Sequence, residues 1–180
     1  MQRAVDILAQ IYERGRSSAA LPPPAEKPIV LFNEEIALDV TRTTRADVER
    51  ALGIAFAYPQ RGWHTYCVRA SDGGRLFLSC FYSQERLASA ELYRPRVERA
   101  PNLAPRDLRF RFVPGEIEVG QPFTVLPEYF AIASALPAQL GPYAEMFEAR
   151  FPGGAAYAMG NGGTIERLAL YVLAESRETA

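Results

Sequence analysis

One imidazole and two thiols, at His64, Cys67 and Cys80, are the side chains that most readily do covalent chemistry. Cysteine catalysis needs a base that holds the thiolate and a third group that orients the base. His64 and Cys67 are three residues apart in a segment typical of a strand, so we expect them on opposite faces. Only certain strand pairings bring Cys80 near His64. We interpret both cysteines as core residues and keep an enzyme with Cys67 or Cys80 as nucleophile as the alternative.

The other motifs for chemistry are incomplete in this sequence. A zinc site needs about four ligands, and one histidine with two cysteines supplies too few. The glycine-rich run 160–164 lacks the lysine of a phosphate-binding loop, and Ile165 stands where a dinucleotide fingerprint needs glycine. The acidic pairs Glu34–Glu35 and Glu145–Glu148 show no sign of facing each other across a cleft. We therefore expect no catalytic residue, no metal site and no cofactor.

Arginine dominates the basic residues. The 180 residues carry a net charge of −1, and Lys27 is the single lysine among 20 basic side chains. A chain without excess positive charge is not expected to bind nucleic acid, because such binding rests on neutralising many phosphates. The most basic stretch, 94–111, holds six arginines against Glu98 and Asp107. It is either a solvated loop of an arginine-rich protein or a surface for an acidic partner protein.

The N-terminal residues show neither a signal-peptide core nor a membrane span. Asp6, Glu13 and Arg14 interrupt the apolar residues there. No stretch of the chain approaches the ~18 consecutive apolar residues that a membrane-spanning helix needs. We expect a cytoplasmic protein that does not bind membranes and whose thiols stay reduced.

Periodicity and turn signals predict the elements that must position these residues. Helical spacing over 3–14 and the prolines of 16–28 predict an N-terminal helix on an extended linker. A capping box from Thr44 to Asp47, with Gly53 as the stop, predicts a helix of about nine residues. Further strands are expected at 29–32, 87–93, 108–113, 155–159 and 165–173, and further helices at 127–136 and after Pro142.

The order of these elements predicts the fold class. For 165–173 a helix also fits the spacing, but the glycine-rich turn before it favours a strand. Strands and helices do not alternate as βαβ units, which argues against a parallel sheet. We expect an α+β fold, an antiparallel sheet packed by a few short helices, with residues 1–28 as N-terminal helix and proline-rich linker and 29–180 as a single domain. No internal repeat stands out.

The clearest element is a hairpin from Trp63 to Tyr82. Its turn signal is Ser71-Asp72-Gly73-Gly74, and two registers are open. With Gly73-Gly74 as the turn, Cys67 faces Cys80; with Asp72-Gly73, Cys67 faces Leu78. In the first register Trp63, Arg69 and Tyr82 share one face, whose aromatic and arginine side chains are typical of interface hot spots. The opposite set, Tyr66, Val68, Phe77 and Phe81, is then the expected core.

Two segments resemble known families. Over residues 36–93 the residues Thr44, Val48, Leu52-Gly53, Pro59, Trp63, Tyr66 and Phe81 follow a pattern that resembles the SmpA/OmlA and BLIP-like fold group. Residues 151–170, a strand, a Gly-Gly turn and a second apolar strand, are similar to the end of SMI1/KNR4 domains, many of which are immunity proteins. Both resemblances imply proteins that act by presenting a surface rather than by chemistry.

We therefore expect a non-catalytic protein-binding module, inhibitor-like or immunity-like, that presents one face of an antiparallel sheet to a protein partner. The expected partner-binding residues are Trp63, Arg69, Tyr82, Arg94 and Arg96. Ordinary packing of Trp63 and Tyr82 is an equal reading. A structural subunit that docks through residues 1–28 is a further alternative.

Overall fold

A computed structural model of the protein describes residues 30–31, 37–38, 41–53, 58–60, 62–70, 72–94, 117–132, 143–151 and 153–172. The expected N-terminal helix and linker (1–28) and the expected strand 108–113 lie outside these residues, as does Arg96. No helix in the described part of the chain is long and apolar enough to span a membrane.

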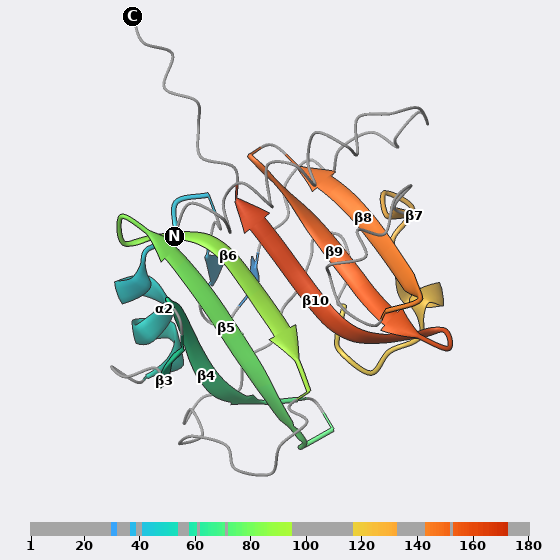
Figure 1. Cartoon of the computed structure of the whole chain (residues 1–180), viewed down its shortest axis with the longest axis horizontal. Coiled ribbons are helices and arrows are strands. Elements are labelled where there is room, and N and C mark those ends of the chain that lie inside the picture. Colours follow the sequence, from blue (N-terminus) through green and yellow to red (C-terminus); the bar gives the residue numbers. More distant parts are fainter. Residues whose placement is uncertain are drawn as a thin grey trace, which may run out of the picture.

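The centre of the molecule is an eight-stranded, fully antiparallel sheet (Figure 1). Its strand order is β3-β4-β5-β6-β10-β9-β8-β7. Two four-stranded meanders, β3 to β6 and β7 to β10, therefore meet through their last strands. The bounds are β3 Tyr58–Gln60, β4 Trp63–Arg69, β5 Arg75–Ser83, β6 Arg86–Tyr93, β7 Ala131–Ile132, β8 Glu145–Phe151, β9 Gly154–Asn161 and β10 Thr164–Val172.

The expected short helix is confirmed as α2, Arg45–Leu52. The Thr44 backbone N–H donates to Asp47 Oδ2 over 2.9 Å, and the Asp47 N–H donates back to Thr44 Oγ1. This reciprocal pairing satisfies two backbone donors that a helix start leaves open. Gly53 then ends the helix with a φ of 67°, a left-handed conformation that glycine adopts without a Cβ clash.

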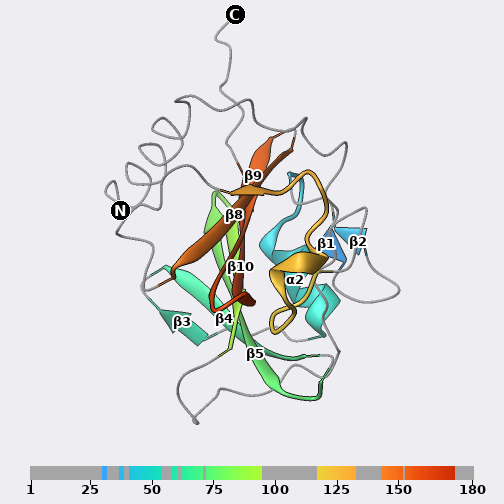
Figure 2. The same cartoon turned by 90° about the vertical axis from the view of Figure 1, so that its right-hand side faces the viewer.

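One face of the sheet, the core face, carries every other described element (Figure 2). These are α2, the small β1–β2 sheet (Val30–Leu31 and Ala37–Leu38) and the segment 117–130 with its 3-10 turn η1, Phe123–Val125. Val48, Ala51 and Leu52 of α2 are fully buried against strand residues such as Tyr66 and Leu78. We call the opposite side, which is turned away from α2, the outer face.

Three further predicted strands are confirmed. β6 covers the expected strand 87–93, and β9 covers 155–159. For 165–173 the strand is correct, since β10 pairs with both β9 and β6. Gly162 and Gly163, with φ values of 60° and 80°, form the two-residue turn between β9 and β10. A two-residue hairpin turn of type I′ requires a positive φ at both central residues, and glycine adopts it readily.

The predictions of two further helices are wrong for the residues that the structure describes. The start of the predicted helix 127–136 is a single turn, closed by the Phe130 N–H on the Pro127 carbonyl, followed by strand β7. The predicted helix after Pro142 is strand β8. β8 pairs with β9 and β7, and it buries Met146 on the outer face and Phe151 on the core face. Its apolar residues therefore fit the spacing of a strand as well as that of the predicted helix. The described residues are mostly sheet, with one α-helix rather than several.

The hairpin from Trp63 to Tyr82 is confirmed, but its register is neither of the two considered. The Ala70 N–H donates to the Gly74 carbonyl over 2.8 Å, and the Gly73 N–H donates to the Ala70 carbonyl. Gly73 has a φ of 79°, as in a three-residue connection with a left-handed last residue. Arg69 therefore pairs with Arg75. The longer connection shifts all pairs relative to both expected turns.

This register changes the membership of the two faces. Trp63 lies opposite Phe81, and Cys67 lies opposite Phe77, so both phenylalanines share the outer face with Trp63 and Arg69. Tyr82 belongs to the core face, where it packs against the buried cluster beneath α2. The assignment of Tyr82 to the Trp63 face, and of Phe77 and Phe81 to the core, was wrong.

Candidate functional site

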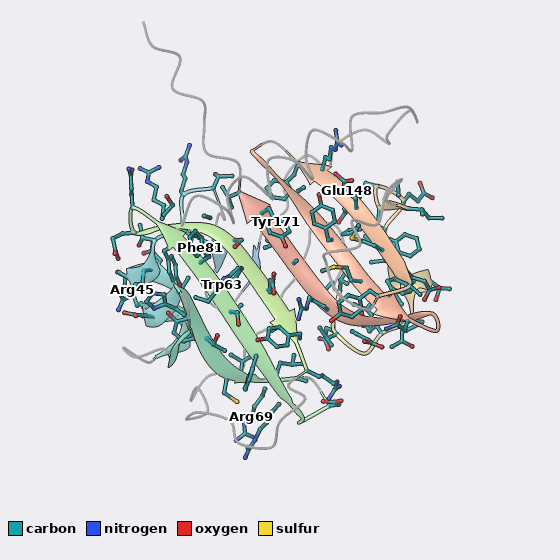
Figure 3. All side chains as sticks on the ribbon, in the orientation of Figure 1. Arg45, Trp63, Arg69, Phe81, Glu148 and Tyr171 are labelled. Atoms are coloured by element: carbon teal, nitrogen blue, oxygen red, sulfur yellow. The ribbon has the colours of Figure 1, made fainter. Side chains whose placement is uncertain are left out.

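Four cross-strand pairs form a line along the outer face of β4 and β5. We call these residues the β4–β5 strip. Figure 3 shows Trp63 and Phe81 beside each other over these strands and Arg69 toward the far end. The pairs, in order, are Trp63/Phe81, Thr65/Ser79, Cys67/Phe77 and Arg69/Arg75.

The first pair is a half-buried aromatic contact. The rings of Trp63 and Phe81 are 5.7 Å apart between centroids and tilted by 48°. Gly62, at a φ of 88°, lies beneath this pair, where an added Cβ would stand 3.5 Å from the Phe81 ring. Both aromatic side chains retain accessible surface. Tilted aromatic pairs of this kind are rigid and apolar, which suits them to contact another surface.

The middle of the strip is a closed set of hydrogen bonds. The hydroxyl oxygens of Thr65 and Ser79 are 2.9 Å apart, and Ser79 Oγ is 3.2 Å from the Tyr93 hydroxyl. The Tyr93 ring in turn meets Phe77 edge to face at 5.9 Å. Thr65 and Ser79 are only 6% and 5% exposed. The three hydroxyl groups therefore satisfy one another and link β4, β5 and β6.

The last pair places two like charges opposite each other. Arg69 and Arg75 are both exposed, and their Cα atoms are partners across β4 and β5. Like charges directly opposite in an antiparallel pair lower stability. A guanidinium group carries several N–H donors in one plane, and Arg75 places such a group at this exposed end of the strip. This end of the strip is therefore suited to bind a carboxylate.

Arg94 is held away from the strip. Its guanidinium forms an ion pair with Asp72, so it ties the end of β6 to the loop of the β4–β5 hairpin. The Arg94 hydrogen bond, followed by the Gly74 backbone N–H, keeps the pKa of the Asp72 carboxyl below its ordinary value. Of the expected partner-binding residues, the structure thus brings Trp63 and Arg69 into one strip. It places Tyr82 and Arg94 elsewhere.

The two cysteines are buried, and Tyr82 is half-buried. The ring of Tyr82 meets that of His64 edge to face at 5.3 Å, and burial raises the pKa of its hydroxyl. Burial also raises the pKa of the Cys67 thiol, and that of Cys80 to about 12. The register does place His64 opposite Cys80, yet the Cys80 thiol is fully buried. A nucleophilic cysteine needs an accessible thiolate, so this geometry speaks against the enzyme alternative.

A second group of polar residues, the seam cluster, joins the two meanders on the outer face. It consists of Glu91 and Tyr93 on β6 and Arg167 and Tyr171 on β10. Arg167 Nη1 lies 3.4 Å from Glu91 Oε2, and the Arg167 guanidinium stands 4.7 Å from the Tyr93 ring centroid. Burial raises the pKa of the Glu91 carboxyl, and the charge of Arg167 opposes that rise. The cluster links neighbouring strands in the middle of the sheet.

The seam cluster and half of the strip were missed from the sequence. Phe81, Phe77 and Arg75 join the strip only through the register, which depends on how many residues the hairpin connection holds. The seam cluster depends on the pairing of β6 with β10, two strands far apart in the chain. The alternation of Arg167 with apolar residues in 165–173 was the one local signal.

Other chemistry has no support among the described residues. They hold no group of three or more histidine, cysteine, aspartate or glutamate side chains placed to bind a metal ion. Comparisons of the whole chain with protein-family models, with curated proteins and with solved structures found no match.

Proposed function

We propose that this chain is a protein-binding module that takes its partner on the β4–β5 strip, in an inhibitor-like or immunity-like role. One observation carries the proposal: exposed arginines and a half-buried aromatic pair lie on the same face of β4 and β5. Tryptophan and arginine are the residues most enriched at energetic centres of interfaces. An acidic group on the partner would be attracted to the exposed guanidinium of Arg75.

The buried state of the two thiols favours this reading over catalysis. An interface made by Trp63 and Phe81 needs shape and apolar surface, which the tilted pair supplies. Removing a tryptophan anchor from the centre of an interface commonly costs 2 kcal/mol or more, about a thirtyfold loss of affinity.

Site-specific crosslinking tests the proposal in the cells that produce the protein. A benzophenone amino acid replaces Phe81 in one variant and Ile132 in a matched control variant. Ile132 is 75% exposed on β7, at the opposite edge of the sheet from the strip. We expect one protein to be captured from position 81 and not from position 132.

Purified proteins then give the deciding measurement. We expect the captured protein to bind the chain in titration calorimetry, and Trp63→Ala to weaken that binding about tenfold or more, while Ile132→Ala leaves it unchanged. Both variants must unfold at the temperature of the unmodified chain. Equal capture from both positions, or unchanged affinity of a folded Trp63→Ala variant, refutes the assigned face.

A further inference from the structure

We propose that the turn between β5 and β6 is a second contact of the partner, at which Gln84 and Glu85 bind a basic side chain. This inference rests on the proposed function and adds a contact at the aromatic end of the β4–β5 strip. Phe81 is two positions before Ser83, where β5 ends, and Trp63 lies opposite Phe81. The turn therefore follows the aromatic pair directly. Figure 1 shows it as the loop that joins the arrowhead of β5 to β6.

The backbone of this turn differs from that of the other described hairpins. Gln84 and Glu85 have φ values of 50° and 63°, and among the described residues they are the two with a positive φ that are not glycine. The connections before β5, β9 and β10 use Gly73, Gly153 and Gly162-Gly163 instead. Left-handed backbone is costly for a residue with a Cβ and easy for glycine. The β5–β6 turn thus keeps two side chains where glycine would be the more stable residue.

The hydrogen bonds that hold the turn use backbone atoms. The Arg45 N–H donates to the Glu85 carbonyl over 3.0 Å, and the Leu87 N–H donates to the Thr43 carbonyl over 2.9 Å. These bonds join the turn to the start of α2, and glycine at position 85 would accept the first of them equally well. The side chains at positions 84 and 85 are exposed. Costly conformations that the surrounding structure holds in place are found most often at sites of binding and catalysis.

The two exposed side chains offer oxygen acceptors. Glu85 has a carboxylate and Gln84 an amide oxygen, whereas the charged ends of lysine and arginine have donors only. Of the two carboxylates that act on Arg45, that of Glu49 forms an ion pair with it over 2.9 Å and has the larger effect. Because the turn backbone is fixed, little conformational freedom is lost when a partner binds. The turn is therefore suited to receive a lysine or an arginine of the partner.

Thermal unfolding of the purified chain tests the first step, that the two side chains cost stability. The double variant Gln84→Asn/Glu85→Gly has the sequence that a two-residue turn with two positive φ values favours. We expect it to unfold about 2 to 4 °C above the unmodified chain, because the strain at positions 84 and 85 is relieved. A lower unfolding temperature would mean that the two side chains stabilise the fold, and it would overturn the inference.

Crosslinking tests the second step in the cells that produce the protein. A benzophenone amino acid replaces Gln84 in one variant and Thr164 in a matched control variant. Thr164 is exposed beside the β9–β10 turn, and Figure 1 shows the two turns at opposite corners of the sheet. We expect position 84 to capture the same protein as position 81, and position 164 not to capture it.

The pattern of capture separates this inference from the proposed function. Capture from position 81 without capture from position 84, or capture of different proteins from the two, overturns the inference and leaves the proposed function standing. Capture from neither position refutes both. Equal capture from positions 84 and 164 also overturns the inference, because the contact would then not be specific to this turn.

Calorimetry with the captured and purified protein measures the contact itself. We expect Glu85→Gln, which removes the charge and keeps the shape, to weaken binding about tenfold, the change expected for one hydrogen bond to a charged group. The double variant should bind at least as weakly although its fold is the more stable one, and Thr164→Ala should leave the affinity unchanged. Added salt should weaken the unmodified chain more than Glu85→Gln. Unchanged affinity of Glu85→Gln and of the double variant would overturn the inference, whereas Trp63→Ala tests the proposed function separately.

Discussion

Glu91 stands in the middle of the sheet with most of its side chain withdrawn from water. Arg167 lies 3.4 Å away, and the Tyr171 hydroxyl lies 3.5 Å from Glu91 Oε1. Burial nevertheless dominates and raises the pKa of the carboxyl. A carboxyl whose pKa is higher in the folded than in the unfolded state binds protons more tightly when folded. Its ionisation therefore costs stability.

The upward shift of the Glu91 pKa predicts how the stability of the chain depends on pH. The unmodified chain should lose stability as the pH rises from the ordinary pKa of glutamate through the raised pKa of the folded state. Glu91→Gln, which resembles the protonated carboxyl, should show a flatter profile and a stability at pH 7 equal to or above that of the unmodified chain. Urea unfolding from about pH 4 to pH 8 measures both. A variant clearly less stable at pH 7 would show that the ion pair with Arg167 outweighs burial.

The two thiols give a second prediction at this scale. Cys67 is 1% exposed and Cys80 is fully buried, and burial raises the pKa of both. Because the thiolate is the reactive form, iodoacetamide should label both cysteines slowly in the folded chain and rapidly in denaturant. Mass spectrometry of labelled peptides measures each rate. Fast labelling of either cysteine in the folded protein would restore the enzyme alternative.

Some site residues could be predicted from residue type alone, and others could not. Trp63 and Arg69 share one face as expected, because they are six positions apart on a single strand. Phe81 and Arg75 are on the neighbouring strand, so their face depends on the length of the hairpin connection. Local sequence left that length open, since Asp72, Gly73 and Gly74 suit several turns. An acidic partner for Arg94 was also not visible, since Asp72 is 22 residues away.

At the scale of elements, predictions succeeded where a cap or a glycine turn marks the boundary. The helix after Thr44 and the turn at Gly162-Gly163 require particular backbone conformations, and the residue types report them directly. Strands β7 and β8 were predicted as helices although Gly153, with a φ of 84°, follows β8, because a glycine after an apolar run also suits the end of a helix. Their state is set by the pairing of β7 with β8 and of β8 with β9, and therefore by residues that follow each strand in the chain.

The capping box of α2 predicts a measurable helix contribution. Thr44→Ala should lower the free energy of unfolding by about 1 kcal/mol, because the Asp47 N–H then loses its acceptor. Asp47→Ala should lower it by a similar amount. Since the two side chains serve each other, the double variant should lose less than the two single losses together. Strict additivity in chemical denaturation would contradict the reciprocal pairing.

The turn between β9 and β10 predicts a contrast between two glycines. A Cβ at Gly160 would stand 1.8 Å from the Thr164 carbonyl oxygen, so Gly160→Ala should force the strands apart and destabilise the protein by several kcal/mol. A Cβ at Gly162 would meet nothing within 4 Å, and Gly162→Ala should cost about 1 kcal/mol for its positive φ. The unfolding temperatures of the two variants measure this order. The reverse order would contradict the close approach of β9 and β10.

At the scale of the molecule, one buried cluster extends beneath both meanders. It includes Leu78 and Leu92 of the first meander and Ala158 and Leu170 of the second, and α2 packs on it. The β6–β10 pairing and the seam cluster join the same halves on the outer face. Because neither half buries its apolar face alone, they should fold together.

This continuity predicts a single cooperative transition. Trp63 fluorescence reports only on the first meander, whereas far-ultraviolet circular dichroism reports on all strands. The two signals should therefore give the same midpoint in urea. A fluorescence midpoint clearly below the circular dichroism midpoint would mean that the meanders unfold one after the other.

The strand order also implies an approximate dyad. A half-turn about an axis that is perpendicular to the sheet and passes between β6 and β10 places β3, β4, β5 and β6 on β7, β8, β9 and β10, respectively. The rotation leaves the outer face on the same side of the sheet. It takes the β4–β5 strip to β8–β9, where Met146, Tyr157 and Met159 are buried. The topology offers two corresponding places, and the exposed arginines with the half-buried aromatic pair lie at one of them, on β4 and β5. The expected stoichiometry is one partner per chain.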